Sequence, residues 1–309
     1  MPVFVINPDP YSLPTYRIGP FQTKDLSLNQ LLPDLDIIDN YFHERFGDFR
    51  FTYTYNGREA IHLALKHYKL SKNDVVTILT TTGNFYISSC VTNEIEKFCK
   101  WSREILPETK VLFVNHEFGY PYPELRKLKL LNLPVIEDCA GSFFSEDNEK
   151  TIGRTGDFVI YSFPKMFPLQ IGGLLVSASH INHNYSGQIQ AGMLRYIKNV
   201  LSEHIGKKDQ IIRQRIKNYT ELRSRFEESG LSERFKLEKG IVPGVFMFRT
   251  GNHNINLPEL KKHFWAHGIQ SSVFYGEDAF FIPVHQALTE FDLDYFYEVM
   301  KVFIQIADK

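Results

Sequence analysis

The sequence predicts an α/β protein with a mainly parallel sheet covered by helices, followed by a second, smaller α/β domain. The chain has 309 residues, enough for two domains or one large one at about 100–200 residues per domain. After the first 25 residues or so, apolar runs of strand length alternate with helical patterns, which is typical of a parallel sheet between helices. Near residue 203 the alternation of apolar runs and helical patterns gives way to a long charged pattern that predicts a helix.

The first domain begins with a proline-rich segment that shows no periodicity, so we expect an extended arm over about residues 1–25. The next pattern, "EAIHLALKHYKL", predicts a helix. The runs "VVTILT" and "KVLFVNH" predict buried strands, and "LRKLKLLNLPVIEDCA" predicts a helix, a break at Pro134 and a strand. The residues that form the apolar face of the first helix are Ala60, Ile61, Ala64, Leu65 and Tyr68.

The second domain is expected to open with the charged helix "DQIIRQRIKNYTELRSRFEESG", with Gly230 as a stop signal. Beyond it, "GVFMFRT", "LPELKKHFWAHG", "IQSSVFYG" and "FDLDYFYEVMKVFIQIA" predict strand, helix, strand and helix. We therefore divide the chain into an arm with a large domain, 1–205, and a small domain, 206–309. The apolar stripe expected on the charged helix is Ile212, Ile216, Tyr219, Leu222 and Phe226.

Composition excludes some classes of function. The chain is 43% hydrophobic and 23% charged, with a formal net charge of -1, so nothing favours bulk attraction to nucleic acid or to an anionic membrane. There is no signal-like start and no run near the roughly 20 apolar residues of a membrane span, so we expect a cytoplasmic protein. Cys90, Cys99 and Cys139 lie far apart, which indicates neither a disulfide framework nor a metal site.

The first candidate functional residue is a lysine within an apolar stretch of the sequence. Lys165 lies within "YSFPKMFPLQIGGLLVSAS", and lysine is almost never fully buried without a partner. It is therefore either a surface residue between two core segments or a residue held in a pocket for its amine.

Three other stretches belong with this lysine. In "YNGREAIHLAL", Asn56 and Gly57 precede a helix, whose N-terminal amides could hold a phosphate. In "LPVIEDCAGSFFS" a strand ends in Glu137 and Asp138, and strand ends are where α/β sheets bind ligands. Asp138 could meet such a ligand or cap the next turn, whereas its neighbour must point to the opposite face. The turn in "GRTGDFVIYSF" leads into the strand that carries Ser162.

Together these stretches supply a phosphate cradle, a carboxylate, a hydroxyl and a lysine, which is the set that pyridoxal phosphate requires. The lysine amine would form an imine with the cofactor, and the carboxylate would keep the pyridine nitrogen protonated so that the ring can accept electrons. The helix amides and Ser162 would hold the phosphate. We therefore expect pyridoxal 5'-phosphate as the cofactor.

The chain also resembles a known family, the DegT/StrS sugar aminotransferases of the aspartate-aminotransferase-like fold, from about residue 50 to the C-terminus. The resemblance rests on "NGREAIHLAL", "VNHEFGYPYPELRKL", "VIEDCAGSF" and "GRTGDFVIYSFPKMFPLQIGGLLV", four motifs in the family's order. It implies a three-layer large domain of the pyridoxal-phosphate-dependent transferase fold (fold type I) with a smaller C-terminal α/β domain. By this likeness Asp138 is the pyridine partner, Ser162 a phosphate ligand and Lys165 the imine lysine.

The resemblance extends to four further positions around the cofactor. Gly57 lies in the phosphate-binding turn, and Arg58 could touch phosphate or simply solvent. Tyr86 falls where the family often has an aromatic that stacks on the pyridine ring, although core packing explains it equally well. His285, in "FFIPVHQAL", resembles a small-domain segment near the substrate pocket, and a structural histidine is the alternative.

The chain departs from the family pattern at several points. Gly141 stands where many members have His or Gln, and Ile171 replaces the acid that usually precedes the Gly-Gly pair. Only two residues separate Ser162 from Lys165. The segment "SGQIQAGMLRYIKN" lacks the Asn-Tyr-Arg run that reaches the partner subunit's phosphate in the family.

The resemblance implies an aminotransferase that moves an amino group from an amino acid such as glutamate to a keto-sugar nucleotide. That activity belongs to nucleotide-sugar and polysaccharide biosynthesis. The implied partners are these small molecules and a second copy of the chain in a homodimer. Two alternatives stay open. One is another pyridoxal-phosphate reaction, a lyase or dehydratase, although the family's dehydratases have lost the imine lysine. The other is a cofactor-binding or regulatory protein without turnover.

Overall fold

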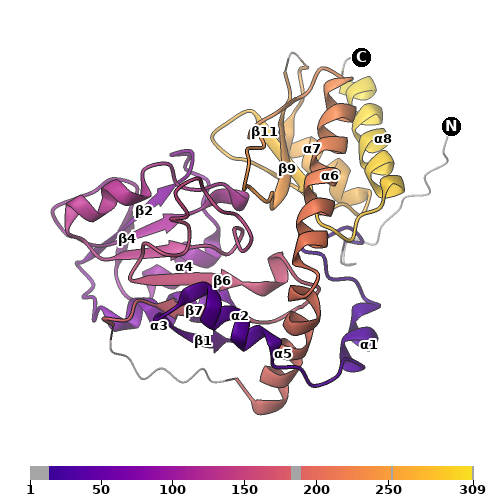
Figure 1. Ribbon diagram of the computed structural model, residues 1–309. Helices are drawn as coiled ribbons and strands as arrows, with labels where there is room; N and C mark the ends of the chain where they lie inside the picture. Colours follow the sequence, from indigo (N-terminus) through magenta and orange to yellow (C-terminus); the bar gives the residue numbers. More distant parts are fainter. Residues whose placement is uncertain (1–13, 182–188, 252, 308–309) are drawn as a thin grey trace. The chain divides into compact units, whose positions relative to one another are not determined.

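The computed structural model describes residues 14–181, 189–251 and 253–307, which form two compact units (Figure 1). The larger unit contains residues 21–208 and 239–242. The smaller unit contains the described parts of 1–20, 209–238 and 243–309. The sequence-based domains, 1–205 and 206–309, differ from these units in the arm, at 206–208 and at 239–242, and they remain a prediction.

A seven-stranded sheet forms the centre of the larger unit, in the order β1-β7-β6-β5-β4-β2-β3 (Figure 1). Strands β3, β2, β4, β5 and β6 run parallel, while β7 is antiparallel to both β6 and β1. Consequently β1 runs in the same direction as β6, and their carboxyl ends share one edge. The bounds are β1 Arg50–Thr54, β2 Val75–Thr80, β3 Lys100–Ser102, β4 Thr109–Asn115, β5 Val135–Asp138, β6 Phe158–Ser162 and β7 Gly173–Ser177.

Helices cover both faces of this sheet, as expected for its mainly parallel strands. One face packs against α3 and α4 through a shared apolar core that includes Ile136 and Ile160. On the other face, Phe42 of α2 contacts the rings of Phe51, Tyr53 and Phe163. The bounds are α1 Asp25–Gln30, α2 Ile37–Phe46, α3 Gly57–His67, α4 Ser89–Glu96 and α5 Ala191–Ile205, with short 3-10 helices η1 Glu117–Gly119, η2 Leu125–Leu131 and η3 Phe163–Lys165.

The smaller unit contains a four-stranded antiparallel sheet in the order β10-β11-β9-β8. Its apolar core joins α6, α7 and α8 to β9 and β11. The bounds are α6 Lys208–Glu227, β8 Ser232–Glu233, β9 Val245–Arg249, α7 Leu257–Ala266, β10 Ser272–Val273, β11 Ala279–Pro283 and α8 Glu290–Ala307. The mixed α/β fold with a large, mostly parallel sheet is therefore confirmed.

The stripe expected on the charged helix is wrong at its first two positions. Ile212 and Ile216 are only half-buried, whereas Ile211 and Arg215 are buried. The guanidinium of Arg215 donates from Nε to Gln286 Oε1 (2.8 Å) and from a terminal nitrogen to the Pro243 carbonyl (3.1 Å). A charged residue on the core-facing side cannot be recognised from hydrophobic periodicity.

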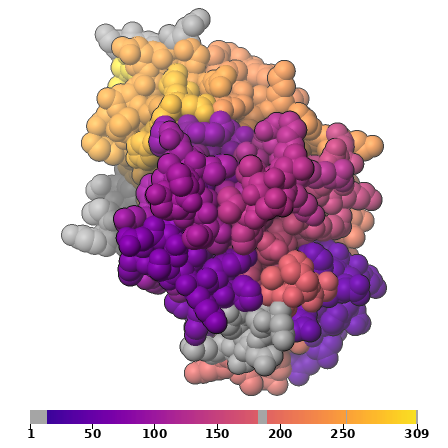
Figure 2. Space-filling view, turned by 90° about the vertical axis from the view of Figure 1, so that its left-hand side faces the viewer, coloured from indigo at the N-terminus to yellow at the C-terminus, as the bar shows by residue number. Residues whose placement is uncertain are grey.

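The surface of the larger unit carries apolar side chains around α1 and α2. The exposed residues of this segment are Leu26, Leu28, Leu31 and Ile37. Figure 2 views the molecule from the side on which β2 and β4 lie, where magenta segments form much of the surface. None of the described helices combines the length and apolar composition that crossing a membrane requires.

Candidate functional site

Polar residues end neighbouring strands at the carboxyl edge of the large sheet. Thr80 of β2 pairs with Asn115 of β4, and Asn115 pairs with Asp138 of β5. Asp138 in turn pairs with Ile160 of β6, and Ser162 lies two residues further along that strand. Three adjacent strands therefore end in a row of polar side chains, and a hydroxyl follows on the fourth.

These side chains lie on the face of the sheet that α3 covers. Side chains alternate between the two faces of a strand. Phe113, Ile136 and Ile160 belong to the apolar core shared with α3. Asn115, Asp138 and Ser162 each stand two residues beyond one of them. Alternation therefore directs all three to the same face.

The N-terminus of α3 completes this edge. Asn56 caps the helix, because its Oδ1 accepts from Glu59 N at 3.0 Å, and Glu59 Oε2 accepts from Tyr55 N at 2.5 Å. Within the described residues, the backbone N–H groups of Gly57 and Arg58 have no hydrogen-bond acceptor. Two free amides at a helix N-terminus are suited to bind an anion.

Ser162 lies directly against this helix end. A methyl group placed on Gly57 would come within 3.3 Å of Ser162 Cβ and 3.7 Å of its hydroxyl oxygen. The hydroxyl has no hydrogen-bond partner among the described residues. The structure thus brings the predicted phosphate-binding turn and hydroxyl together, with three donors unused. The Arg58 side chain is exposed.

The Gly-Gly pair after the lysine makes this close approach possible. A side chain on Gly173 would lie 2.8 Å from backbone or side-chain atoms of Thr54, Asn56 and Tyr161. Gly172 has a φ of +107° and links β1 to η3, since its N–H donates to Tyr55 O (2.7 Å) and its carbonyl accepts from Phe163 N (3.1 Å). Residues with side chains would force the helix end away from β6.

Asp138 is buried, with 7% of its surface exposed. Its Oδ1 accepts from Ala140 N at 3.0 Å, so the turn-capping contact considered from the sequence is present. Its other carboxylate oxygen has no hydrogen-bond partner among the described residues. One oxygen thus fixes the carboxyl group and the other is available to a ligand.

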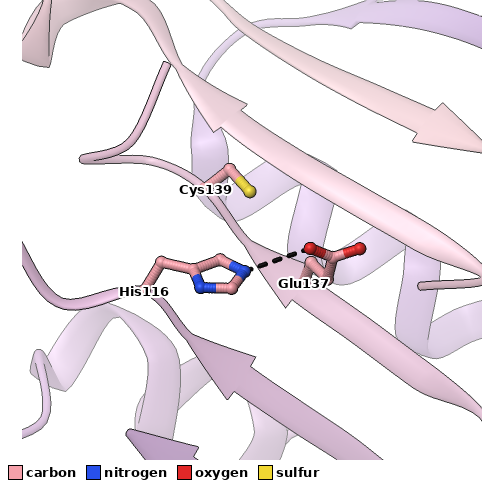
Figure 3. A group of neighbouring side chains, drawn as sticks. All are labelled: His116, Glu137 and Cys139. Atoms are coloured by element: carbon pink, nitrogen blue, oxygen red, sulfur yellow. Dashed lines mark hydrogen bonds and ion pairs between the residues drawn. The ribbon is translucent and has the colours of Figure 1, made fainter. Parts of the chain in front are cut away.

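Glu137, on the opposite face, is fully buried and accepts four hydrogen bonds, of which Figure 3 draws the one from His116. Oε2 accepts from His116 Nε2 (3.1 Å) and Gly153 N (2.8 Å). Oε1 accepts from Thr155 N (2.8 Å) and Gly156 N (2.5 Å). This carboxylate therefore ties the turn before β6 to the ends of β4 and β5.

His116, Glu137 and Cys139 are close enough for their donor atoms to hold a metal ion, but their hydrogen bonds commit them otherwise (Figure 3). Nδ1 of His116 accepts from Tyr122 N at 2.9 Å, so the ring proton is on Nε2 and points to Glu137. Burial raises the pKa of the Cys139 thiol well above its usual 9.0. The cluster is a buried hydrogen-bonded anchor.

Lys165 ends η3 and is exposed, although Phe163, Met166 and Phe167 around it are buried. This exposure is compatible with both alternatives considered from the sequence. The amine can therefore be reached by a ligand.

Tyr86 belongs to the loop after β2 and is half-buried. Its ring lies 6.0 Å from that of Phe118, which has a left-handed backbone (φ 54°, ψ 24°) unusual for a bulky residue. A methyl group on Gly141 would contact Phe118 Cα at 3.5 Å. The strained turn at Phe118 therefore occupies the space beside position 141, three residues after Asp138.

His285 lies in the other unit and is buried. Its Nδ1 accepts from Ala287 N at 3.3 Å, and its carbonyl accepts from Asn218 Nδ2 at 2.9 Å. Burial, with the nearby charge of Arg215, lowers its pKa to about 3. These contacts are those of a neutral structural histidine, the alternative considered for it.

Two residues of this edge escaped the sequence-based interpretation. Asn115 could have been found from "KVLFVNH", because it continues the alternation of Val111 and Phe113. Nothing in the sequence indicated the contact of His116 with Glu137, since the two residues are 21 positions apart in separate motifs.

Comparison with known proteins confirms the resemblance to the sugar aminotransferases. Residues 99–191 match the model of the DegT/DnrJ/EryC1/StrS aminotransferase family. The chain is 32% identical over 145 residues to GDP-perosamine synthase of Escherichia coli O157:H7. That match covers 40% of this chain and 38% of the relative, so it spans well under half of either protein.

Solved structures share the fold over nearly the whole chain. The aminotransferase TlmJ from Streptoalloteichus hindustanus superposes with a TM-score of 0.72 at 15% identity, over 93% of this chain and 95% of that one. An E. coli GDP-4-keto-6-deoxy-D-mannose-3-dehydratase with bound hydrated PLP has a TM-score of 0.67 at 14% identity, over 93% and 100%. At these identities the likeness concerns the fold alone, and the fold predicted from the sequence is confirmed.

Proposed function

Taking the match of residues 99–191 to the DegT/DnrJ/EryC1/StrS aminotransferase family as the premise, we propose that the protein is a pyridoxal-phosphate-dependent aminotransferase. The observation that carries the proposal is the set of unused polar groups at one sheet edge. It comprises the amides of Gly57 and Arg58, the Ser162 hydroxyl and one oxygen of Asp138. These groups fit a ligand with a phosphate at one end and a basic ring nitrogen at the other.

Pyridoxal phosphate, when bound, supplies a carbonyl that accepts amines and a ring that stabilises negative charge. The helix amides and the Ser162 hydroxyl would hold the phosphate. Asp138 would keep a proton on the ring nitrogen, because a nearby carboxylate favours the protonated form. Lys165 would supply the amine that attaches the cofactor, and as a free amine it would serve as a general acid and base. Tyr86, whose ring lies 6.0 Å from that of Phe118, would be an aromatic neighbour of the ring.

We further propose that the acceptor is a keto-sugar carried by a nucleotide and that the donor is an amino acid such as glutamate. The acceptor is supported by the partial match to GDP-perosamine synthase. The proposed role belongs to nucleotide-sugar and polysaccharide biosynthesis. His285 is not assigned to substrate binding, because its ring is buried and hydrogen-bonded within the smaller unit. The cytoplasm is the proposed location, consistent with three free cysteines.

Reduction with borohydride after incubation with pyridoxal phosphate tests the attachment site. The expected result is a pyridoxyl label on the peptide that contains Lys165, and no label in Lys165→Ala. A label on a different lysine, or none, would overturn the assignment. Addition of glutamate to the unreduced complex then tests turnover. Conversion of the cofactor to its amine form supports an aminotransferase, whereas a spectrum that never changes supports the alternative of a cofactor-binding protein without turnover.

A homodimer is the proposed assembly. It is supported by the exposed apolar side chains at Leu26, Leu28, Leu31 and Ile37, because exposed apolar side chains that cluster in one segment are typical of a surface covered by a partner. Light scattering at micromolar concentration should give twice the mass of 36.0 kDa. A monomer that binds the cofactor normally would contradict this assembly.

A further inference from the structure

Asn115 occupies a position where an apolar residue would satisfy the fold. The two preceding residues on its face of β4, Val111 and Phe113, are fully buried in the core shared with α3. Asn115 comes last in the strand, is half-buried, and continues the same face. An amide at the rim of an apolar surface loses part of its hydration, and this costs free energy unless it finds a hydrogen-bond partner.

Within the described residues that partner is absent. The backbone of Asn115 pairs in the sheet, and its carbonyl also accepts from Thr81 Oγ1 at 3.4 Å. Its side-chain amide makes no hydrogen bond with any described residue. The side chain therefore faces the site with both its donor and its acceptor capacity unused.

The register places this amide beside the carboxylate already assigned. Asn115 and Asp138 are direct partners on adjacent parallel strands, on the same face. Neighbouring strands lie about 4.8 Å apart, so a single aromatic ring with its substituents can reach both side chains. Asp138 also has one oxygen without a partner in the described chain.

We propose that Asn115 is a cofactor-contacting residue, whose side-chain amide hydrogen-bonds the ring hydroxyl of pyridoxal phosphate, two ring atoms away from the nitrogen that Asp138 would contact. This inference rests on the proposed function. A neutral amide beside the carboxylate orients the ring in its plane without changing the charge of the site. Asn115 thereby selects for a ring with a polar group at that position.

The test is the affinity for pyridoxal phosphate of the full chain carrying Asn115→Ala, measured by absorbance titration. The expected loss is about 2- to 12-fold, the range for one neutral hydrogen bond. The apoprotein should melt within about 2 °C of the wild type, because no described protein contact is removed. Asn93→Ala, an exposed residue of α4, is the matched control and should leave affinity unchanged.

A double variant separates a shared ligand from two independent effects. Asn115→Ala and Asp138→Asn should be non-additive for affinity, since both groups contact one ring. Unchanged affinity in Asn115→Ala, or a fall that accompanies a lower apoprotein melting temperature, would overturn the inference while the proposed function stands. Failure of the wild type to bind pyridoxal phosphate would remove both.

Discussion

Replacing Glu137 by Gln is expected to destabilise the larger unit strongly while leaving its shape almost unchanged. The carboxylate is fully buried and accepts from four donors, namely His116 Nε2 and the backbone N–H groups of Gly153, Thr155 and Gly156. Glutamine has one acceptor oxygen and one NH₂ group, so two of the four donors would face a donor.

The magnitude follows from those two donors. A buried donor left without an acceptor costs about 1–3 kcal/mol, so the expected loss is about 2–6 kcal/mol in the free energy of unfolding. Domains are stable by about 5–15 kcal/mol, and the variant should therefore fold but unfold at a clearly lower denaturant concentration. The larger unit contains Trp101 and the smaller unit Trp265. Tryptophan fluorescence in a Trp265→Phe background thus reports the larger unit alone.

The matched control is Glu108→Gln in the same background. Glu108 is exposed, and its side chain makes no hydrogen bond with the described residues. Its substitution should change stability by less than about 0.5 kcal/mol. If Glu137→Gln were as stable as this control, the carboxylate would not be the anchor of the turn before β6, and the reasoning would fail.

Three further predictions concern the site and the smaller unit. Asp138→Asn should retain the cofactor but slow the amino-transfer half-reaction about ten- to a thousandfold, because a nearby opposite charge shifts the pKa of the ring nitrogen by about 1–3 units. Rapid-mixing absorbance measures the rate of this half-reaction, and an unchanged rate would mean that the ring nitrogen lies elsewhere. Ser162→Ala should weaken pyridoxal phosphate about ten- to a hundredfold, as expected for a hydrogen bond to a charged group, and leave the affinity for unphosphorylated pyridoxal unchanged; equal losses for both ligands would contradict phosphate binding. Burial lowers the pKa of His285 to about 3, so on acidification the unfolded chain binds a proton at this histidine before the folded chain does. The stability that neutral His285 contributes is therefore complete above about pH 6.5, and below that pH it falls by up to about 1.4 kcal/mol per pH unit. Denaturant titrations at pH 7.5 and pH 5 measure this loss in the free energy of unfolding, and His285→Gln should reduce it. An equal loss between the two pH values in the wild type and in His285→Gln would refute the prediction.

The strands at the centre of the larger unit could be predicted from the sequence. "VVTILT" and "KVLFVNH" correspond to β2 and β4, and "VIED" to β5, because continuous apolar runs mark strands buried on both faces. Helix α5 and strand β11 were not anticipated. The first begins without a side-chain cap, and the second follows β10 after a short turn. In such segments tertiary packing rather than local pattern fixes the structure.

The site was predictable where it depends on alternation and order along the chain. Asp138 and Ser162 end strands on one face, as their spacing from Ile136 and Ile160 indicates. The buried network around Glu137 was not predictable, because its donors come from two separate segments, one after β4 and the other before β6. The exposure of Lys165 could not be inferred either, since Phe163, Met166 and Phe167 around it are buried.

The position of β7 has a consequence for the order in which this protein can mature. β7 lies between β1 and β6 and pairs Arg50 with Ser177, so the N-terminal end of α3 is supported by a strand made more than a hundred residues later. Contacts of such long sequence separation form slowly in folding. A nascent chain that has not yet extended past Ser177 already contains the α3 amides and Ser162, but it lacks the strand that joins β1 to β6. The close approach of Gly57 to Ser162 would therefore be completed only when β7 closes the sheet.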